Sequence, residues 1–236
     1  MEMKKEVFAA GLCIGLGLVI LGFSLKGAIE NFKAKDRVVT VKGLSEKEVP
    51  ADRVIWPLTF KEIGDDLASM NTNILVKNKT IVDYLKNNGI KESEISVSAP
   101  EIIDMQAERY AATASRYRYN ITSIVTVTST DVTKVRDLIG RQNELIKQGI
   151  AIASDDYRFQ KQYVYTKLNS IKPVMIEEAT KNARASALKF AQDSESKLGK
   201  IKTADQGQFS ISDRDANTPH IKTIRVVTTI NYYLED

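Results

Sequence analysis

An uncharged apolar run near the N-terminus divides this chain into two parts of different character. Residues 7–25 read VFAAGLCIGLGLVILGFSL and contain no acidic or basic side chain. At about 1.5 Å per residue, a helix of this length covers a hydrocarbon core of roughly 30 Å. Two lysines precede the run, and Gly22 and Ser24 offer a position for signal cleavage. The sequence therefore predicts a signal-anchor or transmembrane segment at residues 1–25, or a removed signal peptide, and export of the remainder.

Counting reactive side chains excludes several kinds of site within one chain. The chain has one cysteine, Cys13, and one histidine, His220, so an intramolecular disulfide and a Cys/His metal cluster are excluded. A serine–histidine–aspartate site has only His220 to use, and the sequence supplies no evident partner for it. No HExxH, CxxC or glycine-rich phosphate loop is present. We therefore predict no catalytic, cofactor-binding or metal-binding residue, no cofactor, and a protein that is not an enzyme.

The charge of the chain does not favour nucleic acid as a partner. The 34 basic and 30 acidic residues give a formal charge of +4, and the two signs are spread evenly. Cations and aromatic residues do alternate at Arg109 and Tyr110 and over residues 116–119. On the strand expected at residues 117–130, however, the tyrosines face one way and Arg118 faces the other. A half-buried strand explains this pattern, and we expect no nucleic-acid partner.

After a connector at residues 26–37, strand and helix patterns alternate to the end of the chain. Alternating apolar residues predict strands at 38–42, 53–60, 95–105, 117–130 and 157–165, near Phe209 and Ile211, and at 224–234. Apolar residues at helical spacing predict helices at 65–88, at 131–149 and from Pro173 to near Gly199. This order predicts an α+β fold of mixed strands in which amphipathic helices pack on one face of the sheet.

Local signals place the ends of these helices. The first helix opens with Asp65 and Asp66 and stops at Gly89, while the second has Asp131 as a plausible N-cap and stops at Gly149. The long helix carries one predicted packing face, formed by Ile176, Ala179, Ala183, Ala187, Phe190 and Ala191. Its many alanines predict close packing on a sheet or another helix. In the second strand Pro57 predicts an edge position or a bulge, because proline donates no ladder hydrogen bond.

Three short motifs have the spacing of known sites but lack the companions that the chemistry needs. The segment 213–217 starts like a calcium loop, yet Thr218 occupies the glycine position and Ile224 stands in place of the bidentate glutamate. We interpret the segment as a solvated turn and His220 beside it as a surface or strand-edge residue. Ser194 and Lys197 have S-x-x-K spacing, but the stretch is typical of the polar end of a helix. The segment 43–45 resembles half a nucleophile elbow and lacks its closing glycine.

Adjacent carboxylates are also not predicted to form a catalytic pair. They occur at 65–66, 155–156 and 177–178, at or near the expected starts of elements. Acidic side chains there favour the helix dipole or are solvated. Side chains one residue apart do not share a helix face, so no paired acid and base is implied.

The segment Val39–Phe60, VTVKGLSEKEVPADRVIWPLTF, resembles the opening of the SIMPL-domain family, whose bacterial members include periplasmic and outer-membrane immunogenic proteins. Five residues match that opening: Gly43, Glu48, Pro50, Asp52 and Val54. The resemblance extends over nearly all of residues 38–236, through LKNNGI at residues 85–90 and the alanine-rich helix. It implies an α+β fold, export to the cell envelope and, in some members, large ring- or channel-like oligomers. Members are associated with stress defence, and the family supplies no catalytic residue.

Together these observations predict a SIMPL-like domain at residues 38–236 behind the N-terminal segment. We expect a cell-envelope protein, anchored in the inner membrane with its domain in the periplasm, or periplasmic after cleavage. Its expected partners are the membrane, through the N-terminal helix, and further copies of the chain, in a non-enzymatic self-associating scaffold or stress-related binding module. Two alternatives stay open: an exported hydrolase or small-ligand-binding protein with a carboxylate/Arg pocket, and a ring- or channel-forming oligomer.

Overall fold

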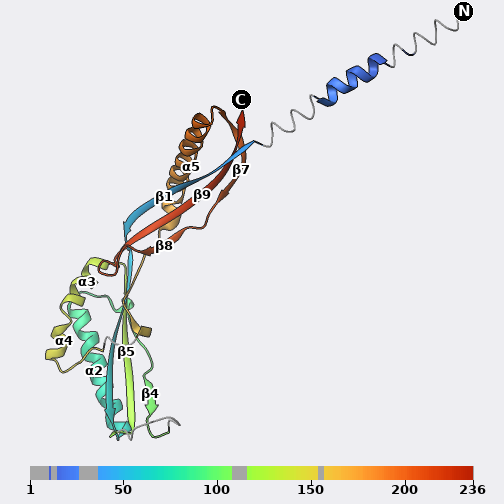
Figure 1. Ribbon diagram of the computed structural model, residues 1–236. Helices are drawn as coiled ribbons and strands as arrows, with labels where there is room; N and C mark the ends of the chain where they lie inside the picture. The colour runs from blue at the N-terminus through green and yellow to red at the C-terminus, as the bar shows by residue number, and fades with distance from the viewer. Residues whose placement is uncertain (1–10, 12–14, 27–36, 108–115, 154–156, 236) are drawn as a thin grey trace, which may run out of the picture. The chain divides into compact units, whose positions relative to one another are not determined.

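The computed structural model describes residues 11, 15–26, 37–107, 116–153 and 157–235 and has a mixed α+β fold (Figure 1). The strands are β1 (Val38–Pro50), β2 (Arg53–Gly64), β3 (Ile95–Val97), β4 (Glu101–Asp104), β5 (Tyr119–Ser129), β6 (Gln162–Val164), β7 (Lys197–Gln206), β8 (Ser210–Asp213) and β9 (Ile221–Glu235). The helices are α2 (Leu67–Asn87), α3 (Val132–Gly140), α4 (Asn143–Lys147) and α5 (Leu168–Asp193), with short 3-10 helices η1 (Glu92–Glu94) and η2 (Tyr157–Phe159). The predicted α+β class is confirmed.

The chain divides into two compact units. Unit 1 comprises residues 1–47, 169–210 and 224–236, and unit 2 comprises residues 48–168 and 211–223. Within the described residues, one sheet has the strand order β1-β9-β7, with β8 also on β9. The other sheet has the order β3-β5-β2-β6, with β4 also on β5. The predicted segments 1–25, 26–37 and 38–236 stay predictions.

Unit 2 buries one face of its sheet against helices. Side chains two residues apart on β2, from Val54 to Phe60, point to one side and are buried, as strand alternation requires. They pack with the apolar face of α2, which runs alongside β5 in Figure 1, and with α3 and α4. The largest members of this core include Trp56, Leu58, Phe60, Ile74, Ile81, Leu85, Leu138 and Leu145. The predicted amphipathic helix at 65–88 is confirmed within two residues at each end.

Two helix stops in unit 2 follow the same backbone pattern. Gly89 and Gly149 have φ of 81° and 78°, the left-handed region that favours glycine. After each glycine an isoleucine N–H donates to a leucine carbonyl five residues back, Ile90 to Leu85 and Ile150 to Leu145, both at 3.0 Å. These are Schellman motifs, with a buried apolar contact across each. Both glycine stops predicted from the sequence are therefore confirmed.

Unit 1 packs a stripe of small side chains against its sheet. Met175, Ala179, Ala183, Ala187 and Ala191 recur every fourth residue along α5 and are all buried. Because these side chains are short, the helix backbone approaches the sheet closely. The predicted alanine face is confirmed, but Phe190 was wrongly placed on it, since 59% of that residue is exposed. A helix turns 100° per residue, so residue 190 lies well outside a stripe that passes through residues 187 and 191.

The ends of α5 differ from the sequence prediction. The helix begins at Leu168, five residues before Pro173, so the proline lies inside the helix rather than at its first position. It ends at Asp193, and the chain reverses at Glu195, whose φ is 52°. A Schellman motif closes this end, with the Ser196 N–H donating to the Ala191 carbonyl at 2.8 Å. Gly199, predicted to stop the helix, lies instead in β7, a strand that the prediction missed.

Three other predicted elements are shorter or broken. The strand expected at 95–105 is two strands, β3 and β4, both paired antiparallel with β5. The helix expected at 131–149 is interrupted after Gly140, giving α3 and α4. The segment expected as one strand at 157–165 starts as the 3-10 helix η2 and pairs with β2 only over β6. In each case the spacing of apolar residues continues past the point where the strand or helix ends. That spacing alone therefore does not indicate the end of the element.

Pro57 lies where β2 has only one neighbouring strand among the described residues. β5 pairs along the whole of β2, whereas β6 pairs only with Arg53 to Ile55. On that second side, the Ala153 N–H donates to the Thr59 carbonyl at 2.6 Å. Backbone groups two residues apart point the same way, so the nitrogen of Pro57 also faces the side without β5. The predicted edge position is met locally, although β2 is an inner strand of its sheet.

The N-terminal prediction lies partly outside the described residues, which include only Gly11 and residues 15–26 of the segment 1–25. Residues 15–26 form a helix with exposed side chains. Within the described part of the chain, no helix has both the length and the apolar character required to cross a bilayer. The predicted transmembrane helix is therefore not confirmed.

Candidate functional site

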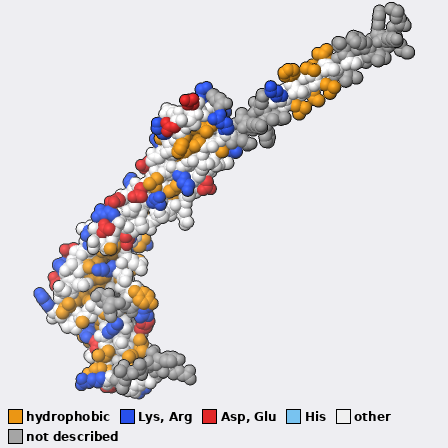
Figure 2. Space-filling view, viewed as in Figure 1, with side chains coloured by type: hydrophobic (Ala, Val, Ile, Leu, Met, Phe, Trp, Pro, Cys, Tyr) orange, Lys and Arg blue, Asp and Glu red, His pale blue; other side chains and the backbone are white. Residues whose placement is uncertain are grey.

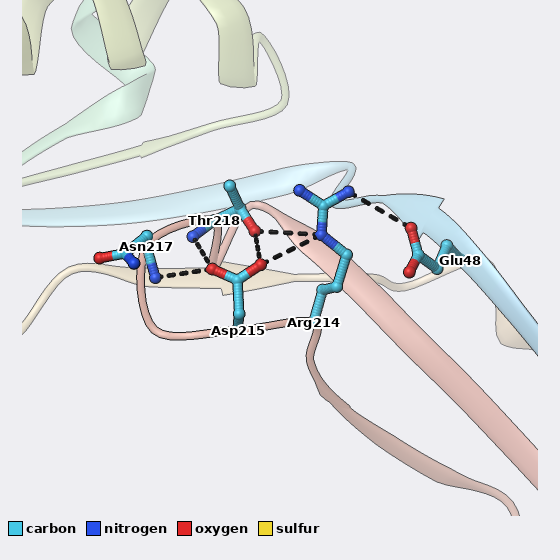
Figure 3. A network of polar contacts seen from close by, with 5 residues as sticks. All are labelled: Glu48, Arg214, Asp215, Asn217 and Thr218. Atoms are coloured by element: carbon cyan, nitrogen blue, oxygen red, sulfur yellow. Dashed lines mark hydrogen bonds and ion pairs between the residues drawn. The ribbon is translucent and has the colours of Figure 1, made fainter.

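A network of polar contacts organises the turn between β8 and β9 (Figure 3). Asp215 lies at its centre and accepts hydrogen bonds from the backbone N–H groups of Asn217 (2.8 Å) and Thr218 (2.7 Å) and from the Thr218 hydroxyl. The Arg214 Nε donates to the same carboxylate at 3.1 Å, and its Nη1 reaches Glu48 of β1 at 3.3 Å. An aspartate that bonds backbone N–H groups two and three residues ahead closes an Asx turn. The network thus gives this turn a defined backbone path.

The charges in this network stabilise one another. The Thr218 hydroxyl, followed by Arg214 and the two backbone N–H groups, lowers the pKa of Asp215 from its ordinary value to about 2. The carboxylates of Asp215 and Glu48 in turn raise the pKa of Arg214. Both side chains therefore carry their charge throughout the pH range in which the protein is expected to function.

The lowered pKa predicts a pH-dependent contribution of Asp215 to stability. Because its folded pKa lies below the ordinary value of about 3.9, the ionised carboxylate stabilises the fold above that pH. The contribution is lost as the pH falls toward about 2. We expect Asp215→Asn to lower the melting temperature at neutral pH, and the difference from wild type to shrink in acid. Thermal melts followed by circular dichroism between about pH 7 and pH 2 measure this. A difference that is the same at every pH would contradict the prediction.

The calcium-like spacing of this segment does not bring its oxygens together around a common point. Asp213 pairs with Lys222 of β9, while Asp215 is committed to the turn. Across the residues that the structure describes, no group of three or more His, Cys, Asp or Glu side chains could hold a metal ion. The interpretation of residues 213–217 as a solvated turn agrees with the structure, in which these five residues are exposed.

His220 follows the turn directly and is half-buried. Its carbonyl accepts a hydrogen bond from the Ala51 N–H at 2.9 Å, which holds the residue beside the end of β1. Its ring meets the Tyr163 ring of β6 edge-on, with centroids 6.1 Å apart. His220 thus lies in the turn directly before Ile221, the first residue of β9.

Two serines considered as nucleophiles have structural partners. Ser45 is buried in unit 1, and its hydroxyl donates to Glu178 Oε2 of α5 at 2.8 Å. Ser194 bonds the Ala191 carbonyl at the end of α5, as expected for the polar end of a helix. Neither serine has a histidine hydrogen-bonded to it among the described residues, since His220 contacts Tyr163 and Ala51.

The adjacent carboxylates have separate roles. Asp66 is the N-cap of α2, and its side chain accepts from the Ala68 N–H at 3.1 Å. Glu177 pairs with Lys181 one turn along α5, whereas Glu178 faces β1. The last two were wrongly placed near a helix start, because α5 begins earlier than predicted. The pair at 155–156 lies outside the described residues.

The arginine–tyrosine pattern is also accounted for by local contacts, except at Arg109 and Tyr110, which lie outside the described residues. The Arg116 and Arg118 guanidinium groups lie over the following tyrosine rings, at 5.5 and 5.0 Å from their centroids. Arg118 also bonds Asp104 on β4 at 3.0 Å. Arg118 is therefore already ion-paired within the protein.

The outer edge of β1 is the most extended backbone surface without a partner in the described part of the chain. β1 has 13 residues and pairs with β9 on one side only. The Leu234 N–H donates to the Arg37 carbonyl at 2.9 Å, so that carbonyl points toward β9. Backbone directions alternate along a strand, and the N–H and C=O groups of Val38, Thr40 and Lys42 therefore point to the free edge. These groups can accept another strand.

The opposite edge, formed by β7, carries features that hinder strand addition. Its pairing with β9 has irregularities between Leu198 and Ile201 and between Ile201 and Thr203. Lysines at positions 197, 200 and 202 add charge to this strand. Bulges and lysines are common means by which proteins protect an exposed edge. The two edges of the sheet thus differ, because β7 carries these irregularities and lysines.

Sequence reasoning missed the contact that holds β1 in place. Gly43 lies under α5, where an added Cβ would be 1.9 Å from the Ala179 carbonyl oxygen and 2.5 Å from the Ala183 nitrogen. The Asn182 side chain donates to the Leu44 carbonyl at 2.8 Å. A glycine inside an alternating strand is the signal that could have indicated this close approach.

Comparison with known proteins identifies one matching family model. Residues 39–230 match SIMPL, described as a protein of unknown function (DUF541). No curated protein matches the chain.

Proposed function

The chain belongs to the SIMPL family, and from that premise we propose that it is a non-enzymatic cell-envelope protein that self-associates as a scaffold or stress-related binding module. The observation that carries this proposal is the outer edge of β1 at Val38, Thr40 and Lys42, which has no neighbouring strand among the described residues. The proposed partner at that edge is a second copy of the chain. Export and anchoring through residues 1–25 belong to the same proposal and rest on the uncharged run at 7–25.

Strand addition suits β1 because the backbone groups along its outer edge are available. The outward face of the strand carries the polar residues Thr40 and Lys42 and the apolar residues Val38 and Leu44, all of them exposed. Main-chain hydrogen bonds supply affinity in this mode of association, and side chains on the two faces set the register. The opposite face of the strand, which includes Val41 and Gly43, is buried against α5. This packing fixes the position of the strand.

The distribution of charge supports a protein partner rather than nucleic acid. Figure 2 shows basic and acidic side chains interspersed over the face in view. Several cations are paired with carboxylates, including Arg118 with Asp104 and Arg158 with Glu101. A nucleic-acid surface instead gathers unpaired cations along one face.

Thr40→Pro tests the proposed edge directly. Proline removes the outward N–H of residue 40 without removing a hydrogen bond to β9, and its ring obstructs an approaching strand. We expect the wild-type chain in detergent to form a defined oligomer by light scattering. The variant is expected to have the mass of one 26.3 kDa chain plus detergent.

The matched control is Thr40→Ala, which keeps the N–H and should keep the oligomer. Circular dichroism must show that both variants retain the wild-type secondary structure. A wild-type protein that is monomeric at high concentration, or an oligomer unaffected by Thr40→Pro, would rule out this edge as the assembly surface. A single closed mass would further favour a ring over an open fibre.

A further inference from the structure

Unit 2 contains a pocket of about 510 Å³ beside the β8–β9 turn. Its walls come from three places in the unit: the end of α3, the start of β6 and the turn itself. The lining side chains that matter for its chemistry are Arg136, Ile139, Lys161, Tyr163, Pro219 and His220. This volume is typical of sites that hold small molecules. The pocket shares no lining residue with the β1 edge proposed for self-association.

The two cations of this pocket differ from most others in unit 2. Neither Arg136 nor Lys161 has a hydrogen bond or ion pair with any residue that the structure describes. By contrast, Arg141 on the same end of α3 pairs with Asp137 at 3.1 Å, and Arg214 pairs with Asp215. Two cations that face one cavity, with no described carboxylate to neutralise them there, attract an anion.

Among the residues that the structure describes, no acidic side chain lines the cavity. Asp215, in the turn beside the cavity, directs both carboxylate oxygens to Arg214, Asn217 and Thr218 (Figure 3). The same hydrogen bonds hold the turn that supplies Pro219 and His220 to the wall. Arg136 and Lys161 therefore give the described lining a positive charge, and hydrogen bonds within the turn fix the backbone of one wall.

Tyr163 and His220 add polar groups beside these cations. Their rings touch edge to face, and both belong to the lining. Burial lowers the pKa of His220, as do the positive charges of Arg136 and Arg214, while Asp215 acts in the opposite direction. Burial raises the pKa of Tyr163, and Arg136 lowers it. At neutral pH the pocket thus presents two cations, a neutral imidazole and a phenol hydroxyl.

We propose that this pocket binds a small organic phosphate. A phosphate monoester carries a charge of about −1.5 to −2 at neutral pH, which matches the two cations, and it offers three acceptor oxygens. The guanidinium of Arg136 can form paired hydrogen bonds with it, and Lys161 acts as a point charge. Ile139, Pro219 and the Tyr163 ring provide apolar surface for the organic part.

Isothermal titration calorimetry of the full-length protein with phenyl phosphate tests the proposal, because this probe combines the anion with an apolar ring. We expect saturable binding that is weaker for inorganic phosphate and for succinate. Arg136→Gln and Lys161→Gln should each weaken phenyl phosphate binding by roughly tenfold, the value of one charge-assisted hydrogen bond. Arg141→Gln is the matched control, since it removes a cation of the same helix end outside the pocket, and it should bind normally.

The pH dependence of binding, through His220, gives a second test of the proposal. Phosphate binding should raise the pKa of His220, so lowering the pH from about 8 to about 6 should favour binding to wild type relative to His220→Gln. Comparing the two proteins at each pH cancels the protonation of the phosphate itself.

Three results would overturn the proposal, provided that circular dichroism shows folded variants. They are no saturable binding of phenyl phosphate, binding unchanged in both Arg136→Gln and Lys161→Gln, and succinate binding as tightly as phenyl phosphate. The last result would assign the pocket to carboxylates instead. The mass measurements on Thr40→Pro do not depend on any of these outcomes.

Discussion

Gly43→Ala is expected to destabilise unit 1 by about 3 kcal/mol, the upper part of the range for overpacked interiors. The added methyl would lie 1.9 Å from the Ala179 carbonyl oxygen and 2.5 Å from the Ala183 nitrogen. Both atoms belong to the backbone of α5, so no side-chain rotation relieves the overlap. The helix must move away from β1, which opens space beneath its alanine stripe and removes dispersion contacts. Urea denaturation followed by far-ultraviolet circular dichroism measures the loss.

Gly140→Ala is the control for this change. A Cβ at position 140 meets nothing within 4 Å, and the residue lies in the last turn of α3. Its expected effect is a gain of up to about 1 kcal/mol, because alanine loses less backbone entropy in a helix. Equal urea midpoints for wild type and Gly43→Ala would show that α5 does not rest on β1 as described.

Phe60→Ala is expected to cost about 3–5 kcal/mol in unit 2, as for other large-to-small changes at buried aromatic residues. Only 1% of Phe60 is exposed, and its ring packs in the core shared by β2, α2 and β5. The chain has a single tryptophan, Trp56, in the same core. Its fluorescence therefore reports the unfolding of this unit, and the urea midpoint followed by that signal should fall strongly.

Phe190→Ala removes the same atoms from an exposed helix position. Its expected cost is within about 0.5 kcal/mol, because exposed side chains away from special features contribute little. Circular dichroism can follow both phenylalanine variants. A similar loss in both would mean that Phe190 is covered by another surface, for example in an oligomer. A small loss in Phe60→Ala would contradict the described core.

Features that depend on nearby residues were predicted well. Asp66 and Asp131 cap α2 and α3 as expected, because an aspartate side chain reaches N–H groups two or three residues ahead in any context. Gly89 and Gly149 end helices for a similarly local reason, their tolerance of positive φ. The sequence of Val39–Phe60 alone indicates the family that the family model then matches over residues 39–230.

Features that depend on distant neighbours were not predicted. β7 has the sequence KLGKIKTADQ and is largely exposed, so it lacks the alternation that marks a half-buried strand. Asn78 lies in the buried stripe of α2, where it is tolerated because the Ser123 hydroxyl of β5 donates to it at 3.0 Å. Glu195 takes a left-handed conformation that its own side chain disfavours. The strand β7 and the burial of Asn78 depend on a partner strand elsewhere in the chain. The conformation of Glu195 depends on the chain reversal between α5 and β7.

The candidate sites divide in the same way. The turn at residues 213–217 and the place of His220 beside it were expected from composition. The pocket beside them was not, because Arg136, Lys161 and Tyr163 belong to elements with no sequence motif in common. The free edge of β1 likewise became visible only when the strand order placed β9 on one side of it and nothing described on the other.

The amino-acid sequence by itself determined the alternation of strands and helices, the helix caps and the family, because these depend on side-chain periodicity and backbone preferences within a few residues. The tertiary structure decided which faces are covered, which cations lack partners and which strand edge is open. Those properties arise from packing between segments that are distant in the chain, such as Gly43 under Ala183. The spacing of residues within either segment does not indicate which other segment it packs against. Only the folded chain brings the two backbones into contact.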